Sequence, residues 1–208
     1  MTTRIKICGI TRDADADAVV TAGADALGLN FAPRSPRCVA VDVAARIADR
    51  VAGAVTRVGL FVDPAPDEVR RVLEAVPLDV LQFHGDETPE FCGSFGMPYM
   101  KALRVREPLD MADLERRFAD ACCLLLDAFV PGQPGGTGQR FDWSLWPAGS
   151  ALPLVLAGGL TPDNVAEAIT RLAPWGVDVS GGVEGPCKGQ KDPQRIEAFV
   201  REVKRARS

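Results

Sequence analysis

Two residues of this 208-residue chain stand where a short apolar run ends, and both could take part in acid–base chemistry. Cys8 lies in the segment KICGIT, and a thiol beside a positive charge can lose its proton and act as a base or a nucleophile. Lys6 would supply that charge if it shared a strand face with Cys8, as residues two apart do. Inert packing is nevertheless the commoner role of a cysteine at a strand end, and the sequence taken alone favours it for Cys8.

Asp127 closes the apolar run CCLLLD. Partial removal from water favours the protonated form of a carboxyl group, so Asp127 could donate a proton near neutral pH. An aspartate that caps the following turn fits this position equally well. The sequence therefore leaves both roles open for Asp127 taken alone.

His84 is the only histidine of the chain and also invites an acid–base role. The three residues after it, Gly-Asp-Glu, are typical of a turn and a helix start. A positioning role for His84 is therefore at least as compatible with the sequence as a direct part in proton transfer.

Basic and glycine-rich segments could bind an anionic ligand. Arg37, in PRSPRCV, could pair with a carboxylate through two parallel hydrogen bonds, and Arg34 competes for this role. Gly158–Gly159 and Ser180–Gly182 each follow an apolar run and lead toward a helical segment, where backbone N–H groups and the helix dipole favour phosphate. Glycine pairs also make ordinary strand-to-helix turns, but their presence at both positions favours a phosphate site.

The elements that must position these residues are eight short apolar runs, several of them apolar throughout, as strands covered on both faces are. The predicted strands are Ile5–Cys8, Ala26–Phe31, Arg57–Val62, Val80–His84, Tyr99–Arg104, Cys122–Asp127, Leu154–Ala157 and Val177–Ser180.

Segments with helix signals lie between these runs. Asp63–Val76 carries apolar residues on one helical face, and Asp192–Arg205 opens with Asp-Pro and ends in basic residues. Thr161–Leu172 is expected to start with Thr161 as the N-cap and Pro162 as the first helical residue. The segments after Gly9, Pro36 and Glu87 also begin with turn or cap residues.

Strands that alternate with helices predict an α/β fold with a parallel sheet. The sheet could be open and doubly wound, but the strand count, the length and the lack of a G-x-G-x-x-G after the first strand favour a closed barrel. We therefore expect a single-domain (β/α)8 TIM barrel over residues 1–208. The loops that follow the carboxyl ends of the strands would bring the candidate residues together at one end of the barrel. The glycine-rich segment 129–141 would be a lid over that end rather than a solvated linker.

The composition agrees with an ordinary globular protein, at 47% hydrophobic and 25% charged residues. The net charge of −4 gives no sign of nucleic-acid or membrane-surface binding. From the apolar runs and the first residues we expect neither a membrane-spanning segment nor a signal peptide. The six cysteines form no C-x-x-C pair and one histidine leaves little for a zinc site, so we expect reduced thiols in a cytoplasmic protein.

Several segments together resemble the phosphoribosylanthranilate isomerase family from one end of the chain to the other. These are KICGIT at 6–11, GADALGLNFAPRSPRCV at 23–39, VGLFVD at 58–63, LQFHGDE at 81–87, LLLDA at 124–128, GGTGQRFDW at 135–143, LAGGLTPDNV at 156–165, GVDVSGGVE at 176–184 and KD at 191–192.

The resemblance implies a (β/α)8 barrel that performs an Amadori rearrangement in tryptophan biosynthesis. It would convert N-(5-phosphoribosyl)anthranilate to 1-(2-carboxyphenylamino)-1-deoxyribulose 5-phosphate, with no metal or organic cofactor. By motif, Cys8 is the general base, Asp127 is the general acid and Arg37 contacts the anthranilate carboxylate. The other residues implied in substrate binding are Gly158, Gly159, Asp178, Ser180, Gly181 and Gly182, with His84 in a positioning role.

One departure from the family pattern affects the phosphate site. Position 181 is Gly181 where the family commonly has a serine, so one hydroxyl near the phosphate is missing while the backbone donors remain. The expected partner is a small phosphorylated molecule, and the chain would work as a monomer or a homodimer.

Two other functions compete with this interpretation. The sugar-phosphate isomerase of histidine biosynthesis performs the same rearrangement with aspartates at the ends of its first and sixth strands. Cys8 at the first of these positions argues against that enzyme, and equally against a bifunctional one. A non-catalytic phosphate-binding barrel is disfavoured because Cys8, Asp127 and Arg37 occur together.

Overall fold

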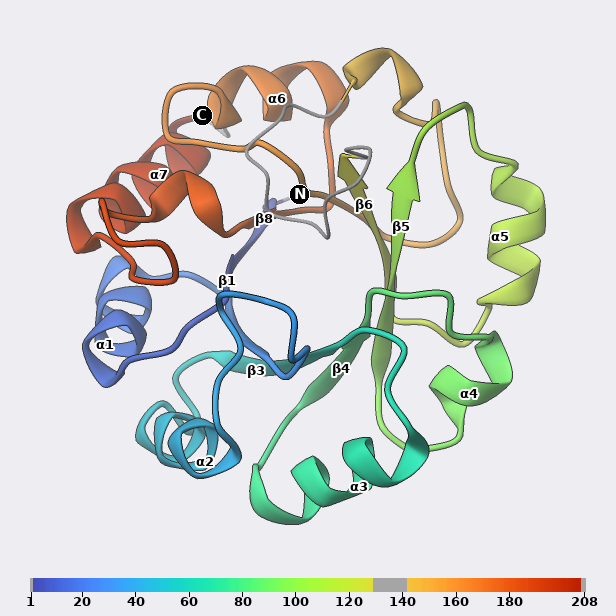
Figure 1. Cartoon of the computed structure of the whole chain (residues 1–208). Coiled ribbons are helices and arrows are strands. Elements are labelled where there is room, and N and C mark those ends of the chain that lie inside the picture. The colour runs from blue at the N-terminus through green and yellow to red at the C-terminus, as the bar shows by residue number, and fades with distance from the viewer. Residues whose placement is uncertain (1, 129–141, 207–208) are drawn as a thin grey trace.

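The computed structural model describes residues 2–128 and 142–206, and within them eight parallel strands close into a barrel (Figure 1). Each strand pairs with its neighbours in sequence, and β8 pairs with β1. The predicted barrel is confirmed, and every predicted strand agrees with the structure to within one residue at each end. The strands are β1 Arg4–Cys8, β2 Ala26–Asn30, β3 Thr56–Phe61, β4 Val80–Phe83, β5 Tyr99–Val105, β6 Cys123–Ala128, β7 Leu154–Leu156 and β8 Gly176–Val179.

Helices surround this barrel as an outer ring (Figure 1). Between β6 and β7 the described residues contain the 3₁₀ turn Trp143–Leu145 rather than an α-helix. The segment 129–141, expected to form a lid, lies outside the described residues. The helices are α1 Asp13–Ala22, α2 Val41–Arg50, α3 Pro66–Ala75, α4 Pro89–Gly93, α5 Met111–Arg117, α6 Val165–Leu172 and α7 Pro193–Arg205.

Two helix starts differ from the prediction, while α7 begins as expected with Asp192 accepting from the backbone N–H of Gln194. Helix α6 starts at Val165, so Thr161 is not its N-cap; the Asn164 side chain accepts from the Thr161 N–H and closes a turn ahead of the helix. Helix α3 starts at Pro66 because Asp63 has a positive φ of 46° and bonds to the neighbouring loop. A side-chain hydrogen bond to a nearby backbone group competes with helix initiation in both cases.

The core has two parts, as the barrel architecture requires. The larger apolar cluster packs the outer faces of the strands against the helices. A second cluster, distinct from the first, fills the inside of the barrel, where side chains from neighbouring strands form layers. Its buried members are Val58, Met100, Ala102, Cys123, Leu125, Val155 and Ala157.

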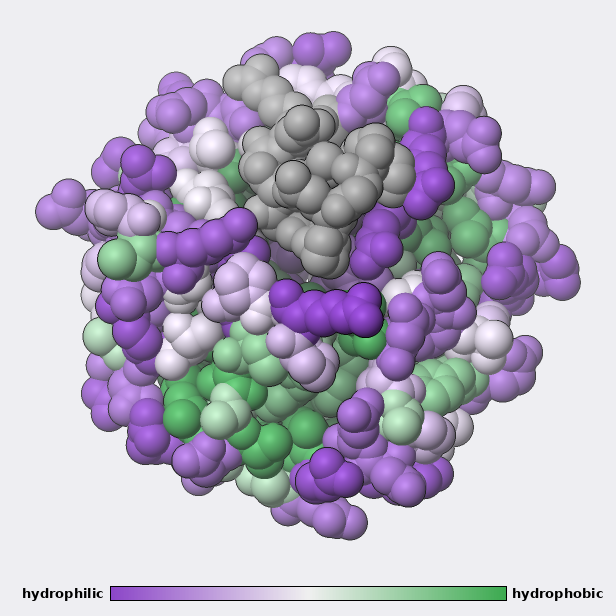
Figure 2. Space-filling view, in the orientation of Figure 1, coloured by the Kyte–Doolittle hydropathy of each residue, from purple (hydrophilic) through white to green (hydrophobic). Residues whose placement is uncertain are grey.

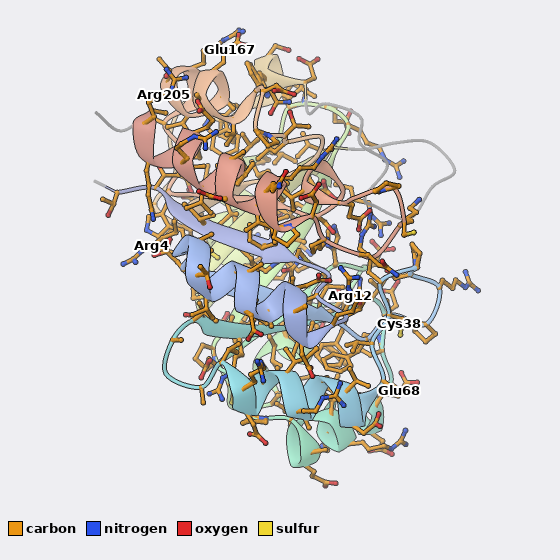
Figure 3. The ribbon with its side chains drawn as sticks, turned by 90° about the vertical axis from the view of Figure 1, so that its left-hand side faces the viewer. Arg4, Arg12, Cys38, Glu68, Glu167 and Arg205 are labelled. Carbon is orange, nitrogen blue, oxygen red and sulfur yellow. The ribbon has the colours of Figure 1, made fainter. Side chains whose placement is uncertain are left out.

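The two ends of the barrel have different surroundings. Arg12 and Cys38, which follow β1 and β2, lie toward one end, and Arg4 and Arg205 lie toward the other (Figure 3). The loops after the strands therefore share one face of the molecule, where barrels of this kind carry their active sites. Among the described helices, none combines the length and the apolar character that a bilayer crossing demands.

Candidate active site

A cavity of about 820 Å³ opens at the carboxyl end of the barrel. On the face that Figure 2 shows, hydrophobic surface lies between the centre of the molecule and the region of α2 and α3, with hydrophilic side chains around it. Every residue that the sequence singled out as a candidate site residue lines this cavity. These residues are Cys8, Arg37, His84, Asp127, Gly158, Gly159, Asp178, Ser180, Gly181 and Gly182.

Cys8 ends β1 at the floor of the cavity and is only 5% exposed. A methyl group at position 28 on β2 would lie 2.8 Å from Cys8 Sγ and 3.1 Å from Lys6 Nζ, so Gly28 leaves the room that both side chains share. Burial raises the pKa of the Cys8 thiol, and the positive charges of Lys6 and Lys191 oppose this rise without overcoming it. Lys6 shares the strand face of Cys8, as its spacing suggested, and its charge partly offsets the effect of burial on the pKa of the thiol.

Lys6 is itself held by Asp178 on β8, whose Oδ1 lies 2.9 Å from Lys6 Nζ. Both side chains are buried in the barrel. Burial opposes the charged form of Lys6, but Asp178 and Cys8 outweigh it and raise the pKa of the ammonium group. Lys6 therefore remains a fixed positive charge beside Cys8.

Asp127, near the end of β6, lines the same cavity and is 7% exposed. Its Oδ2 is 3.2 Å from Nε2 of His84, which follows β4. On the other side of the imidazole ring, Nδ1 lies 3.3 Å from the amide Nε2 of Gln82. Gln82, His84 and Asp127 thus form a line of polar side chains across the cavity wall.

Arg37 is buried and Arg34 is exposed, and both of the arginines that the sequence left in competition line the cavity. Arg37 donates from Nε and Nη2 to the two carboxylate oxygens of Glu184, at 2.5 Å and 3.0 Å. A methyl group on Gly9 would lie 2.5 Å from Arg37 Cδ, so the glycine after Cys8 lets the arginine pack closely. Among the described residues, Nη1 of Arg37 has no hydrogen-bond partner.

Lys191 completes this charged cluster from the segment before α7. Its Nζ donates to Glu184 Oε1 at 3.3 Å and to the carbonyl oxygen of Ser180 at 3.0 Å. Burial lowers the pKa of Lys191, with Glu184 opposing the change. Burial also works against the Glu184 carboxylate, but the bonds from Arg37 and the charge of Lys191 hold the pKa of Glu184 below its usual value.

A buried ion pair fixes the loop that follows His84. Lys101 on β5 donates to Glu87 Oε2 and to the carbonyl oxygen of Gly85, each at 2.6 Å. Glu87 also accepts from the backbone N–H groups of Asp63, at 2.8 Å, and of Gly85, at 2.9 Å. These bonds join the loops after β3 and β4 to β5, and so fix the backbone from which His84 enters the cavity.

The two glycine-rich strand ends contact each other. Gly158 and Gly159 have φ values of 86° and 65°, in the left-handed region that glycine adopts without strain. A methyl group on Gly182 would lie 1.9 Å from the carbonyl oxygen of Leu160, so the loops after β7 and β8 touch at this point. Arg195, in the first turn of α7, adds a positive charge to the same side of the cavity.

Sequence reasoning missed four residues of this site. Glu184 and Lys191 stood in quoted segments, GVE and KD, but no local pattern showed that they surround Arg37. Gln82 had a signal, because residues two apart on a strand share a face and His84 was already a candidate. Arg195 had none beyond its place in the first turn of a helix. Among the described residues, no group of three or more His, Cys, Asp or Glu side chains could hold a metal ion.

Comparison with known proteins identifies the family. Residues 5–202 match the family of N-(5'-phosphoribosyl)anthranilate (PRA) isomerases. The N-(5'-phosphoribosyl)anthranilate isomerase of Chromohalobacter salexigens is 56% identical over 201 residues, which cover 97% of this chain and 94% of that protein. The crystal structure of phosphoribosyl anthranilate isomerase from Thermotoga maritima has a TM-score of 0.86 at 39% identity, covering 98% of this chain and 99% of that one.

A second solved structure shows a member of this kind with a bound molecule. It is a phosphoribosyl anthranilate isomerase in complex with reduced 1-(o-carboxyphenylamino)-1-deoxyribulose 5-phosphate, with a TM-score of 0.80, 36% identity, and coverage of 98% of this chain and 99% of that one. With the match over almost the whole length and the shared barrel, this chain belongs to the N-(5'-phosphoribosyl)anthranilate isomerase family of tryptophan biosynthesis.

Proposed function

We propose that Cys8 is the general base and Asp127 the general acid in the conversion of N-(5-phosphoribosyl)anthranilate to 1-(2-carboxyphenylamino)-1-deoxyribulose 5-phosphate. The observation that carries this proposal is that Cys8 at the end of β1 and Asp127 near the end of β6 line the same cavity. An acid and a base that work on one substrate need environments that separate their proton affinities. Cys8 has two lysines nearby, and Asp127 faces a histidine instead.

The first step opens the sugar. Asp127 gives its proton to the ribose ring oxygen, the bond from this oxygen to C1 breaks, and the nitrogen lone pair forms the C1=N bond of a protonated Schiff base. The carboxylate left on Asp127 faces the imidazole of His84. Opening of the ring makes the C2 proton acidic, because the electrons of the C2–H bond can move toward the positive nitrogen.

The second step moves the double bond. The Cys8 thiolate takes the C2 proton, the C1=C2 bond forms, and the electron pair of C1=N returns to nitrogen to give an enolamine. Tautomerisation of the enolamine to the ketone adds a proton at C1 and removes one from the C2 hydroxyl. The sugar gains two protons, at the ring oxygen and C1, and loses two, from C2 and its hydroxyl, so no co-reactant is needed.

The rest of the cavity supplies charge for the two ends of the substrate. Arg37 Nη1 meets the anthranilate carboxylate, because its other two donors are held by Glu184. The loops of Gly158–Gly159 and Ser180–Gly182 receive the phosphate, and Arg195 adds charge at that side. Asp178 contributes by fixing Lys6 rather than by offering a donor. The analogue bound by the related enzyme has a carboxyphenyl group and a phosphate group. A site with one place for a carboxylate and another for a phosphate suits such a molecule, which supports these two assignments.

Turnover by the purified protein tests the reaction itself. N-(5-phosphoribosyl)anthranilate is mixed with the protein and the loss of its fluorescence is followed, in parallel with the sugar-phosphate substrate of the histidine-pathway isomerase. We expect turnover of the first substrate only. No turnover of the first would overturn the proposed function, and turnover of both would show a bifunctional enzyme.

A further inference from the structure

Gln82 is completely buried on β4, and no step of the proposed reaction uses it. Its side chain lines the cavity two residues before His84, and its Oε1 has no hydrogen-bond partner in the described part of the chain. A buried amide oxygen without a partner costs stability. An apolar side chain of the same length would avoid this cost, so the amide is better explained by work in the cavity than by folding.

The amide of Gln82 is the group that faces one ring nitrogen of His84. Gln82 Nε2 lies 3.3 Å from Nδ1 of the ring, and an amide nitrogen can only donate. His84 Nδ1 is then the acceptor, and in a neutral imidazole the proton must be on Nε2. With the amide in this orientation, the contact favours the Nε2–H tautomer of the only histidine in the chain.

The selected proton points to the side of Asp127. His84 Nε2 is 3.2 Å from Asp127 Oδ2, close enough for a hydrogen bond, although the present alignment does not yet satisfy one. Such bonds are often loose in a ligand-free site and tighten when substrate is bound. A small rotation of either side chain would complete the bond from Nε2–H to Oδ2.

The backbone of His84 is already fixed, so its ring is the part left to be oriented. Arg104 Nη2 donates to the His84 carbonyl oxygen at 3.2 Å, and Lys101 with Glu87 holds the following glycine. Within the described residues, Gln82 is the side chain that contacts Nδ1.

We propose that Gln82 is a positioning residue for Asp127, acting through His84. This inference rests on the proposed role of Asp127 as the acid. When Asp127 gives its proton to the sugar ring oxygen, the new carboxylate accepts a hydrogen bond from Nε2–H, and no proton leaves His84. A neutral donor that is already in place stabilises the charge that develops on the acid, as preorganised donors do at other sites of charge development.

The single histidine makes the proposal directly measurable. The ¹⁵N chemical shifts of the two ring nitrogens report the tautomer without assignment ambiguity. The test variant is Gln82→Met, which keeps the length of the side chain and removes the amide. The control is Met100→Leu, an inward-facing residue in register with Gln82 that leaves the amide intact.

We expect the unaltered chain to hold the Nε2–H tautomer, and Gln82→Met to show averaged shifts of the two tautomers. In the same variant kcat falls about tenfold or more while KM changes less, since the lost bond forms with a charge that exists only during turnover. The melting temperature stays the same or rises, because a buried unpaired oxygen is removed. Met100→Leu keeps both the tautomer and kcat.

Other results overturn the proposal. A Gln82→Met variant that keeps the Nε2–H tautomer contradicts the proposal, and so does one that shows both tautomers but has an unchanged kcat. A lower kcat that comes with a lower melting temperature and no change of tautomer also contradicts it. If Gln82→Met does not fold, Gln82→Glu replaces it. The new carboxylate accepts a hydrogen bond from Nδ1–H of His84, so we expect Nδ1 to be protonated and kcat to fall. An Nδ1 that stays unprotonated in Gln82→Glu contradicts the proposal.

The proposed function can fail separately. Full turnover by Asp127→Asn would remove the acid role of Asp127, whatever the ring nitrogens of His84 show. An inactive Asp127→Asn, combined with a normal tautomer in Gln82→Met, would overturn the role of Gln82 alone.

Discussion

The guanidinium of Arg37 and the carboxylate of Glu184 meet through two hydrogen bonds although they lie 147 residues apart in the chain. Each comes from a loop at the carboxyl end of the barrel, after β2 and after β8 respectively. Paired in this way, Arg37 has a fixed direction, and within the part of the chain that the structure describes its Nη1 has no hydrogen-bond partner. In the proposed function this nitrogen meets the carboxylate of the substrate. A preset direction reduces the entropy that substrate binding must overcome.

Replacement of Glu184 tests this arrangement. In Glu184→Gln the two charge-assisted bonds to Arg37 become weaker, so Arg37 loses its fixed direction and the carboxylate of the substrate is bound less well. We expect KM for N-(5-phosphoribosyl)anthranilate to rise about tenfold, with a smaller effect on kcat. Steady-state kinetics measure both, and the matched control is Glu167→Gln on the exposed face of α6. An unchanged KM in Glu184→Gln would contradict the orienting role.

Lys6 should control the pH at which the enzyme becomes active. Burial raises the pKa of Cys8 and Lys6 opposes that rise, so Lys6→Met raises the pKa of Cys8 further. A base must be unprotonated, so kcat/KM increases as the pH rises through the pKa of Cys8, and in Lys6→Met this increase moves to higher pH. A pH profile of kcat/KM checks this, with the exposed Lys188→Met as the control. An increase that stays in place, or moves to lower pH, would show that Lys6 does not act on Cys8.

The ion pair of Lys101 and Glu87 should matter for stability. Both side chains are buried, so Lys101→Met leaves a carboxylate with backbone donors but without its counter-charge. The expected loss is roughly 3–5 kcal/mol in the free energy of unfolding. Denaturant unfolding measures this loss, and the double variant Lys101→Met/Glu87→Gln should recover part of it. A loss no larger than that of the exposed pair variant Arg171→Met would contradict the structural role.

Glu184 should also contribute to the acid sensitivity of the fold. Its pKa is lower in the folded chain than the usual value near 4.5, so its stabilising contribution is complete above that pH and is lost as the pH falls through the lowered value. Glu184→Gln removes this contribution at every pH. Between about pH 5 and pH 3 the variant should therefore lose less stability than the unaltered chain, as measured by denaturant unfolding at each pH. If both proteins lose the same free energy of unfolding between about pH 5 and pH 3, a group other than Glu184 controls the acid sensitivity.

Strands of this barrel could be predicted closely, because each is buried on both faces and its apolar run has clear ends. Val80 to Phe83 is an example, flanked by polar and glycine residues on the side where β4 ends. Helix starts were harder to predict. The Asp63 carboxylate accepts from the backbone N–H of Asp86 in the next loop, and Thr161 Oγ1 accepts from the Asp163 N–H in a turn ahead of α6. Local sequence does not show which of several polar partners such a side chain will choose.

Within the site, sequence reasoning found the residues expected to act on the substrate but not Glu184, Lys191, Gln82 and Arg195, and not the pairings between side chains. Residues two apart on a strand share a face, which placed Lys6 beside Cys8 correctly. Whether the pKa of Cys8 is raised or lowered could not be predicted, because the shift depends on how completely the surrounding strands exclude water. Arg37 and Glu184 meet only when the barrel closes, so their contact depends on the whole topology rather than on any local pattern.

The most direct test of the proposed acid–base pair is the turnover of N-(5-phosphoribosyl)anthranilate by Cys8→Ala and by Asp127→Asn, followed through its fluorescence. Cys38→Ala, an exposed cysteine outside the cavity lining, is the control, and thermal unfolding confirms that each variant is folded. We predict that each cavity variant loses at least about 100-fold in kcat while the control keeps the full rate. Undiminished turnover by both cavity variants would contradict the assignment of Cys8 as base and Asp127 as acid.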